Sequence, residues 1–228
     1  MIDLPSQPNP APDLRGGERV RAVLDMWFKD HGFIRDIYCN RHQISPQAWR
    51  SAQVAPHHVE WAKEHGIKTI LNLRGRRDTC GSYILEREAC QRYGLTLIDF
   101  PLRSRGPLLK PTIHAIADLF PRLEYPILLH CKSGADRAGM MSTFYQFLQE
   151  GVPLPKAMEQ LSLRYGHVKQ AKTGIIDFFF ASYLAYTEKR PMAFLDWVDQ
   201  VYEPETLLAS FKEDWLAGVL VNRILKRE

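Results

Sequence analysis

The sequence contains few cysteines, and their spacing excludes several kinds of protein. The thiols belong to Cys39, Cys80, Cys90 and Cys131, and no two of them form a Cys-x-x-Cys pair. No set of cysteines and histidines has the spacing of zinc ligands, so a metal site and a disulfide framework are both disfavoured. Free thiols in a chain of this size are typical of a reducing compartment. We therefore expect a cytoplasmic protein that holds no metal ion.

The sequence also lacks long apolar runs and a strong net charge. No apolar stretch reaches the roughly 18 residues that a membrane-spanning helix needs, so we expect no transmembrane segment. Residues 1–17 contain four prolines and no basic region followed by an apolar run, which predicts a flexible arm and no signal peptide. The net charge is only +4, and no stripe of Lys and Arg interleaves with aromatics, so no nucleic-acid partner is expected.

What the sequence does contain is an alternation of short apolar strands with helices. Apolar runs at 67–73, 95–102 and 126–130 alternate with helical patterns at 83–93 and 111–123. This alternation predicts an α/β fold whose central, mostly parallel sheet has roughly four or five strands and is flanked by helices. Before it come a short strand or hairpin at 41–53 and a helix at 56–64. After it come helical patterns at 138–150, 155–165, 173–188, 191–201 and 205–226.

These patterns suggest a chain of three segments. Residues 1–40 would hold the arm and an amphipathic helix at 19–33, and residues 41–188 would form the main domain. Residues 189–228 would form a helical extension at the C-terminal end.

One motif, at the end of the strand predicted at 126–130, contains the candidate catalytic residues. It reads His130-Cys131, five residues, then Arg137, and it lies between a buried strand and a helix. In such a turn, successive N–H groups converge on an anion and the helix N-terminus favours negative charge, while Gly134 permits the tight backbone. Arg137 would grip two phosphate oxygens, and Cys131 would act as a thiolate nucleophile. The phosphate-binding positions would be Lys132, Ser133, Gly134, Ala135 and Ala138, with His130 holding the loop.

The stretch from His130 to Gly139 resembles the phosphate loop of the cysteine-dependent protein tyrosine and dual-specificity phosphatases. Trp49 to Gln53 and Gly66 to Arg74 resemble the opening of the compact bacterial and fungal branch with a dual-specificity-like domain. The resemblance covers roughly residues 41–185. It implies a phosphatase domain at 41–188 that hydrolyses phosphomonoesters without a metal or other cofactor, through a phosphate bound covalently to Cys131.

The sequence departs from this family pattern after the arginine. Most members carry a Ser or Thr there, whose hydroxyl eases departure of the thiolate in the second step, but this chain has Ala138. Slower turnover of the phosphoenzyme is expected, with the loop amides stabilising the thiolate. Ser133 or Ser142 are candidates for supplying the hydroxyl instead.

The general acid is the second departure. The family usually takes an Asp from the loop after the preceding strand, and the loop at 102–107 has no carboxylate. Asp136 is the favoured candidate because it precedes Arg137, as in the myotubularin and Sac-type phosphatases that this stretch resembles. A bound phosphate would raise the proton affinity of a carboxylate beside it, as a proton donor requires. Asp99 is the alternative acid, although it lies inside a predicted strand.

Several features leave the substrate open. Arg74, Arg103 and Arg105 follow the ends of predicted strands and would form a cationic rim. A phosphotyrosine-type protein is the default substrate, and a lipid phosphate (phosphoinositide or other) or a sugar phosphate is the alternative. The helix at 205–228 is amphipathic and could contact a membrane peripherally, although packing on the domain or on a second subunit is favoured.

Three further hypotheses concern the spare cysteines, the loop at His167 and functions other than phosphatase. Cys80 or Cys90 could form a protective disulfide with Cys131 on oxidation. The loop carrying His167 could contact substrate or position water, although a plain connector is favoured. A weakly active phosphate-binding module and, more remotely, a sulfur transferase remain alternatives to the phosphatase.

Overall fold

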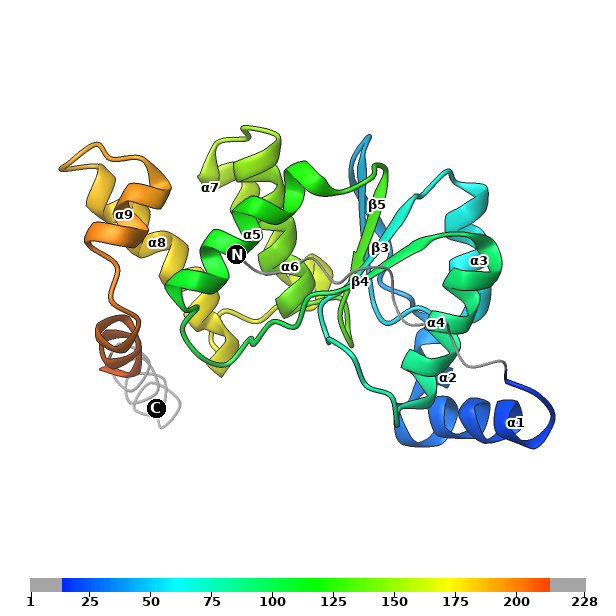
Figure 1. Cartoon of the computed structure of the whole chain (residues 1–228). Helices are drawn as coiled ribbons and strands as arrows, with labels where there is room; N and C mark the ends of the chain where they lie inside the picture. Colours follow the sequence, from blue (N-terminus) through cyan, green and yellow to red (C-terminus); the bar gives the residue numbers. More distant parts are fainter. Residues whose placement is uncertain (1–13, 214–228) are drawn as a thin grey trace.

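The computed structural model describes residues 14–213, and its centre is a five-stranded sheet with the order β1-β2-β5-β3-β4 (Figure 1). Strands β1 and β2 form an antiparallel hairpin, and the pairs β2–β5, β5–β3 and β3–β4 are parallel. The α/β fold with a mostly parallel sheet is therefore confirmed. The strands are β1 (His42–Ser45), β2 (Ala48–Ser51), β3 (Thr69–Asn72), β4 (Thr96–Asp99) and β5 (Ile127–His130).

Helices cover both faces of the sheet (Figure 1). One face carries α3 (Pro56–Glu64) and α4 (Gly81–Tyr93), and the other carries α5 (Lys110–Leu119), α6 (Asp136–Phe144) and α7 (Leu154–Ala157). Alternate strand residues supply the two cores, since Leu71 and Leu129 belong to the α5–α6 side while Ile70 and Leu128 belong to the α3–α4 side. All four are fully buried, which explains why the central strands are apolar without interruption.

The first helical segment differs from the single helix predicted at 19–33. The chain forms α1 (Gly17–Leu24), a π-helical turn (Asp25–Lys29) and α2 (Gly32–Ile37). The interruption falls at His31, whose φ of 56° is left-handed and ends a right-handed helix. The next residue is Gly32, where an added Cβ would lie 2.7 Å from the Met26 carbonyl oxygen, so only glycine fits this close turn.

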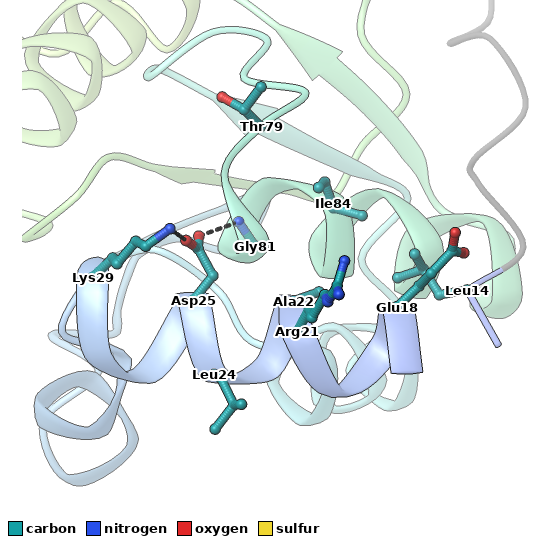
Figure 2. Close-up of a pocket in the computed structure, with 10 residues that line it drawn as sticks. All are labelled: Leu14, Glu18, Arg21, Ala22, Leu24, Asp25, Lys29, Thr79, Gly81 and Ile84. Atoms are coloured by element: carbon teal, nitrogen blue, oxygen red, sulfur yellow. Dashed lines mark hydrogen bonds and ion pairs between the residues drawn. The ribbon is translucent and has the colours of Figure 1, made fainter. Parts of the chain in front are cut away.

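This segment packs on α4 beside a pocket of about 490 Å³ (Figure 2). Asp25 lies between the elements, because its carboxylate accepts a hydrogen bond of 2.7 Å from the backbone N–H of Gly81 and pairs with Lys29 at 2.9 Å. No residue of the 130–139 loop lines this pocket, so it is separate from the predicted phosphate site.

The C-terminal helices share a core with the sheet. Helices α8 (Ile175–Thr187) and α9 (Phe194–Gln200) contribute buried side chains, including Phe179 and Trp197, to the same core as β3, β5 and α6. The predicted helix at 155–165 is broken into α7 and two short 3-10 turns, Met158–Gln160 and Leu163–Tyr165. Within residues 14–213, no helix is long and apolar enough to cross a membrane.

The helix predicted at 205–226 starts at 204 and can be followed to 213. Its remainder, with the basic end of the proposed membrane-binding face, lies outside the described residues, as does the predicted arm up to residue 13.

Candidate active site

The loop between β5 and α6 is held by its carbonyl groups. The backbone N–H of Gln53 donates to the Lys132 carbonyl at 3.3 Å, and Asn40 Nδ2 donates to the Ser133 carbonyl at 2.9 Å. Arg50 Nη2 donates to the two carbonyls that follow, at positions 134 and 135, over 2.7 and 3.1 Å. Four successive carbonyl oxygens therefore accept hydrogen bonds from strand β2, from Gln53 just after it, and from the segment before β1.

The backbone N–H groups of the same loop, unlike its carbonyl groups, make no hydrogen bonds with the described residues. Among the residues that the structure describes, none accepts a hydrogen bond from a backbone N–H between residues 132 and 138. Gly134 has a φ of +73°, which reverses the direction of the peptide groups on either side. A Cβ at Gly134 would lie 2.8 Å from the Ala52 nitrogen, so only glycine fits. The carbonyls thus face the protein, and the loop has the form of an anion-binding nest.

Arg50 brings a buried positive charge to this loop. Its side chain is fully buried, its Nη1 donates to the Gln160 backbone oxygen at 2.7 Å and side-chain oxygen at 2.9 Å, and its guanidinium stacks 4.0 Å over the Tyr165 ring. Burial lowers the pKa of Arg50 to about 10, and attraction to Tyr165 and Cys131 opposes that shift. Arg50 is still charged at neutral pH, and it makes no ion pair with a described carboxylate. Its charge is therefore available to stabilise an anion on the other side of the loop.

Cys131 and Arg137 occupy the two ends of the nest. Cys131 follows β5 directly and is only 2% exposed, and Arg137 lies in the first turn of α6. Arg137 Nη1 lies 3.4 Å from the Leu73 carbonyl oxygen at the end of β3, which holds the guanidinium at the carboxyl edge of the sheet. Ala138 is fully buried in the same turn. One turn later Ser142 is also fully buried, and its hydroxyl has no hydrogen-bond partner among the described residues.

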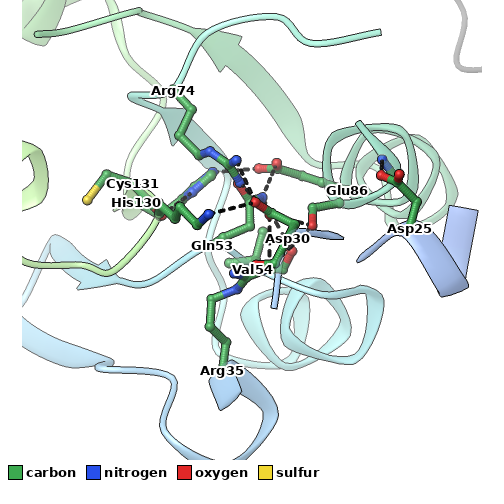
Figure 3. A network of polar contacts seen from close by, with 12 residues as sticks. Asp25, Asp30, Arg35, Gln53, Val54, Arg74, Glu86, His130 and Cys131 are labelled. Atoms are coloured by element: carbon green, nitrogen blue, oxygen red, sulfur yellow. Dashed lines mark hydrogen bonds and ion pairs between the residues drawn. The ribbon is translucent and has the colours of Figure 1, made fainter. Parts of the chain in front are cut away.

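His130 belongs to a polar network that runs away from the loop (Figure 3). Its Nε2 donates to Glu86 Oε1 over 2.6 Å, and both side chains are fully buried. Glu86 Oε2 accepts from Gln53 at 2.6 Å, and Gln53 Oε1 accepts from Arg74 at 2.6 Å. Arg74 then pairs with Asp30 through both of its terminal nitrogens, at 2.8 and 2.9 Å.

Asp30 joins this network to the N-terminal helices. It accepts hydrogen bonds from Arg35 Nη2 at 3.0 Å and from the Ser82 hydroxyl at 2.7 Å. Burial alone would raise the pKa of Asp30, but hydrogen bonds from Arg74 and Ser82 hold it far below the ordinary value. Lys132 of the loop lies 3.4 Å from the same carboxylate. The N-terminal segment therefore supports the loop from two directions.

These contacts correct the prediction for Arg74. Its side chain was expected on a cationic rim, but it is only 3% exposed, because the guanidinium is used by Asp30 and Gln53. Arg103 and Arg105 are exposed in the segment after β4, and Lys132 is 47% exposed.

Asp136 is held by a histidine. Its Oδ1 accepts a hydrogen bond of 2.8 Å from His167 Nδ1, and His167 Nε2 donates to Asp177 Oδ2 over 2.6 Å. The structure thus brings the favoured acid together with the loop that carries His167.

Asp99 lies on a different side of the sheet. It shares a strand face with Leu97, which packs in the core under α3 and α4, whereas Cys131 packs in the core under α5 and α6. Its carboxylate accepts hydrogen bonds from the Tyr83 hydroxyl at 2.5 Å and from Asn72 at 2.7 Å. Burial raises the pKa of Asp99, and these two hydrogen bonds oppose the shift. Asp99 is therefore not grouped with Cys131 and Arg137.

The sequence reasoning missed several site residues. Arg50 and Gln53 lie in the stretch that carried the family resemblance, and a charged residue inside a central strand was a usable signal. Asn40 and Glu86 gave none, because their roles depend on contacts with distant residues. Cys80 and Cys90 are free thiols, and burial raises the pKa of Cys90 well above its ordinary value, which disfavours oxidation there.

Comparison with known proteins agrees with this fold. A family model described as "DSP-PTPase phosphatase fused to NAD+ Kinase" matches residues 36–175, which include β1 to β5 and the whole loop. TpbA from P. aeruginosa has a similar structure, with a TM-score of 0.53 and 18% identity over 72% of this chain and 90% of its own. A DUF442 protein from Shewanella putrefaciens CN-32 gives a TM-score of 0.50 and 18% identity over 65% and 95%. No curated protein matches.

The fold and the family match therefore identify a phosphatase of the dual-specificity-like superfamily. Within it, the chain belongs to the family of dual-specificity-type phosphatase domains known from fusions to NAD+ kinase.

Proposed function

We propose that this chain hydrolyses phosphate monoesters through a cysteinyl-phosphate intermediate, with Cys131 as the nucleophile and Arg137 as the phosphate clamp. The observation that carries the proposal is the polarity of the loop. Its carbonyls at 132–135 bind Gln53, Asn40 and Arg50, so its N–H groups are left to bind a tetrahedral anion beside the Cys131 thiol. A sulfur nucleophile next to a phosphate nest is the arrangement that phosphoryl transfer to cysteine requires.

The proposed reaction has two steps. In the first, the Cys131 thiolate attacks phosphorus while Arg137 and the loop amides hold the equatorial oxygens, and Asp136 protonates the leaving oxygen. In the second, water attacks the cysteinyl-phosphate and the thiolate departs. No metal or other cofactor takes part in this scheme, because Arg50, Arg137 and the loop amides supply the positive charge.

The second step is proposed to limit turnover. Ala138 occupies the position from which a hydroxyl would stabilise the departing thiolate, and it is fully buried. The Ser142 hydroxyl, one helical turn away and without a partner among the described residues, is the available candidate for that role.

The substrate class is proposed to be an anionic phosphomonoester. A phosphotyrosine-type protein is the first candidate, and a lipid phosphate or sugar phosphate is the second. Lys132, Arg103 and Arg105 support a preference for substrates with additional negative charge, because all three residues are exposed. A screen of phosphotyrosine peptides against phosphoinositides, other lipid phosphates and sugar phosphates tests this choice.

A cytoplasmic location is proposed from the free thiols, and peripheral membrane contact through the helix that the sequence predicts at 205–228 is kept as a proposal.

The test is hydrolysis of p-nitrophenyl phosphate by the wild type and by Cys131→Ser. We expect the variant to lose more than about a thousandfold in kcat, since the reaction cannot proceed without its nucleophile. Cys80→Ser is the matched control, because Cys80 is a half-buried thiol at the start of α4, and it should retain wild-type activity.

Acid quenching of the wild type during turnover should leave one phosphoryl group on the peptide that contains Cys131. Full activity in Cys131→Ser would refute the proposed nucleophile. A wild type that binds phosphate but hydrolyses no ester would make the domain a phosphate-binding module.

A further inference from the structure

A histidine clamped between two carboxylates lies directly behind the phosphate loop. His167 donates from Nδ1 to Asp136 Oδ1 at 2.8 Å and from Nε2 to Asp177 Oδ2 at 2.6 Å. The three residues come from three elements, namely the start of α6, the connector after the Leu163–Tyr165 turn, and α8. The proposed phosphatase reaction needs a group that protonates the leaving oxygen. We therefore ask whether this cluster supplies that proton.

The two carboxylates make the imidazole hold an extra proton. Burial alone would lower the pKa of His167, but the hydrogen bonds to Asp136 and Asp177 outweigh it and raise the pKa to about 9. Among the described residues, Lys169 also forms an ion pair with the cluster, and its Nζ lies 3.6 Å from Asp177 Oδ1. At neutral pH His167 is therefore protonated on both ring nitrogens, and each N–H donates to one carboxylate.

Within the cluster, the side chain that belongs to the phosphate loop is also the most exposed one. The side chain of His167 is fully buried, that of Asp177 is 13% exposed, and that of Asp136 is 29% exposed. Asp136 is also the residue next to Arg137, the proposed phosphate clamp. A proton stored on His167 can thus leave most directly through Asp136.

We propose that Asp136, His167 and Asp177 form a proton relay in which His167 supplies, through Asp136, the proton that the leaving oxygen takes. This proposal rests on the phosphatase mechanism proposed above. In the first step the S–P bond to Cys131 forms and the P–O bond breaks, and its electron pair stays on the leaving oxygen. Asp136 protonates that oxygen and receives the Nδ1 proton of His167, which remains neutral with its Nε2–H bound to Asp177.

The second step returns the proton. Water attacks phosphorus and its proton passes to Asp136 and on to His167 Nδ1, while the S–P bond breaks and its electron pair restores the Cys131 thiolate. The cluster begins and ends the cycle with the same charge. Asp177 takes no proton in this scheme, and it acts as a positioning residue that stabilises the imidazolium.

The relay predicts a dependence on the leaving group. His167→Gln keeps a hydrogen-bonding side chain but removes the stored proton. We expect kcat/KM for an alkyl phosphate to fall about 10²- to 10⁴-fold, whereas p-nitrophenyl phosphate, whose leaving group needs little protonation, should lose less than about tenfold. The matched control is His114→Gln, since His114 forms a surface pair with Asp199 at 2.6 Å and should change neither substrate.

The relay also predicts a pH profile. Because the protonated His167 is the active form, kcat/KM for the alkyl phosphate should hold up to about pH 9 and fall above it, following the raised pKa of His167. Asp177→Asn leaves the imidazole with one carboxylate, so that fall should move to lower pH. This variant keeps the inference testable if His167→Gln fails to fold.

The outcomes separate the relay from the underlying function. Equal losses on both substrates in His167→Gln, or an unmoved alkaline limb in Asp177→Asn, would refute the relay and leave a purely structural clamp. A wild type without any p-nitrophenyl phosphatase activity would instead refute the proposed function, and the relay with it.

Discussion

At the scale of single residues, the loop depends on one buried positive charge. Arg50 holds the carbonyls of residues 134 and 135 and the Gln160 backbone from a fully buried position in β2. The planar guanidinium group binds three carbonyl oxygens in a fixed geometry. This fixes the orientation of the loop's peptide groups, so that their N–H groups point toward the proposed phosphate site. Gly134 allows the reversal, and Arg50 maintains it.

Arg50→Lys should therefore impair phosphate binding while keeping the charge. A single ammonium group cannot reach the two sets of carbonyls that Nη1 and Nη2 reach, and each buried oxygen left unpaired costs about 1–3 kcal/mol. We expect kcat/KM for p-nitrophenyl phosphate to fall at least about tenfold. Isothermal titration with inorganic phosphate and steady-state kinetics measure the two effects.

Arg164→Lys is the control for this substitution. Arg164 also stacks on Tyr165, at 5.5 Å, but it is exposed and holds no loop carbonyl, so its replacement should change neither quantity. Wild-type phosphate affinity in Arg50→Lys would contradict the role assigned to the guanidinium fork.

At the scale of elements, the N-terminal helices act as part of the site's support. The network runs from Asp30 through Arg74, Gln53 and Glu86 to His130 (Figure 3). It joins the turn before α2 to the segments just after β3 and β2, and then to α4 and β5. Helix α4 carries both Glu86 and the Ser82 hydroxyl that donates to Asp30. The helices between residues 17 and 37 are therefore part of the support of the site.

Asp30→Asn tests this support. The change removes the carboxylate that pairs with Arg74 in a buried site, and breaking such a pair destabilises a protein by about 3–5 kcal/mol. We expect a loss of that order in the free energy of urea unfolding at pH 7. The pKa of Asp30 is lowered by folding, so the wild-type advantage should be complete above about pH 4 and shrink as pH falls below that value.

Asp78→Asn is the matched surface change. Asp78 also pairs with two arginines, Arg76 at 2.7 Å and Arg87 at 3.0 Å, but its side chain is 51% exposed. Exposed pairs contribute about 0–1 kcal/mol, so equal losses in the two variants would show that the Asp30 network has no special weight.

At the scale of the whole molecule, the C-terminal helices belong to the main core. Trp197 of α9 is 3% exposed and packs against Phe179, Tyr183 and Tyr202. Tyr202 in turn donates its hydroxyl to the Leu108 carbonyl at 2.6 Å, just before α5. The boundary proposed at 188–189 thus divides one continuous set of packed side chains.

Trp197→Ala should destabilise the phosphatase domain as a whole. Removing a large aromatic side chain from a core costs about 3–5 kcal/mol. We expect one cooperative unfolding transition, shifted to lower urea, with activity and circular dichroism lost together. Leu163→Ala, at a site that is 77% exposed, should leave the transition where it is. Two separate transitions would instead mark residues 189–213 as an independent unit.

Much of the fold could be predicted because its signals are local. Strands β3, β4 and β5 lie inside the runs predicted at 67–73, 95–102 and 126–130, since buried parallel strands are apolar on both faces. Helix α4 ends before Gly94, whose φ of 65° is the left-handed cap that a glycine allows. The prediction of one continuous helix at 19–33 was wrong. The apolar residues keep their helical spacing through the break at His31, so the sequence pattern does not reveal the break.

The sequence by itself was enough to propose Cys131 and Arg137 as the reacting pair, because both lie within one strand-to-helix turn and their spacing is a local feature. Only the tertiary structure decided what surrounds them. Arg50 lies 84 residues from the carbonyl it holds, and His167 lies 31 residues from Asp136. Hydrogen bonds over such separations depend on how strands and connectors pack, and packing is a property of the folded chain as a whole. The same packing buries Arg74. Its position after a strand had predicted that it would lie on the cationic rim.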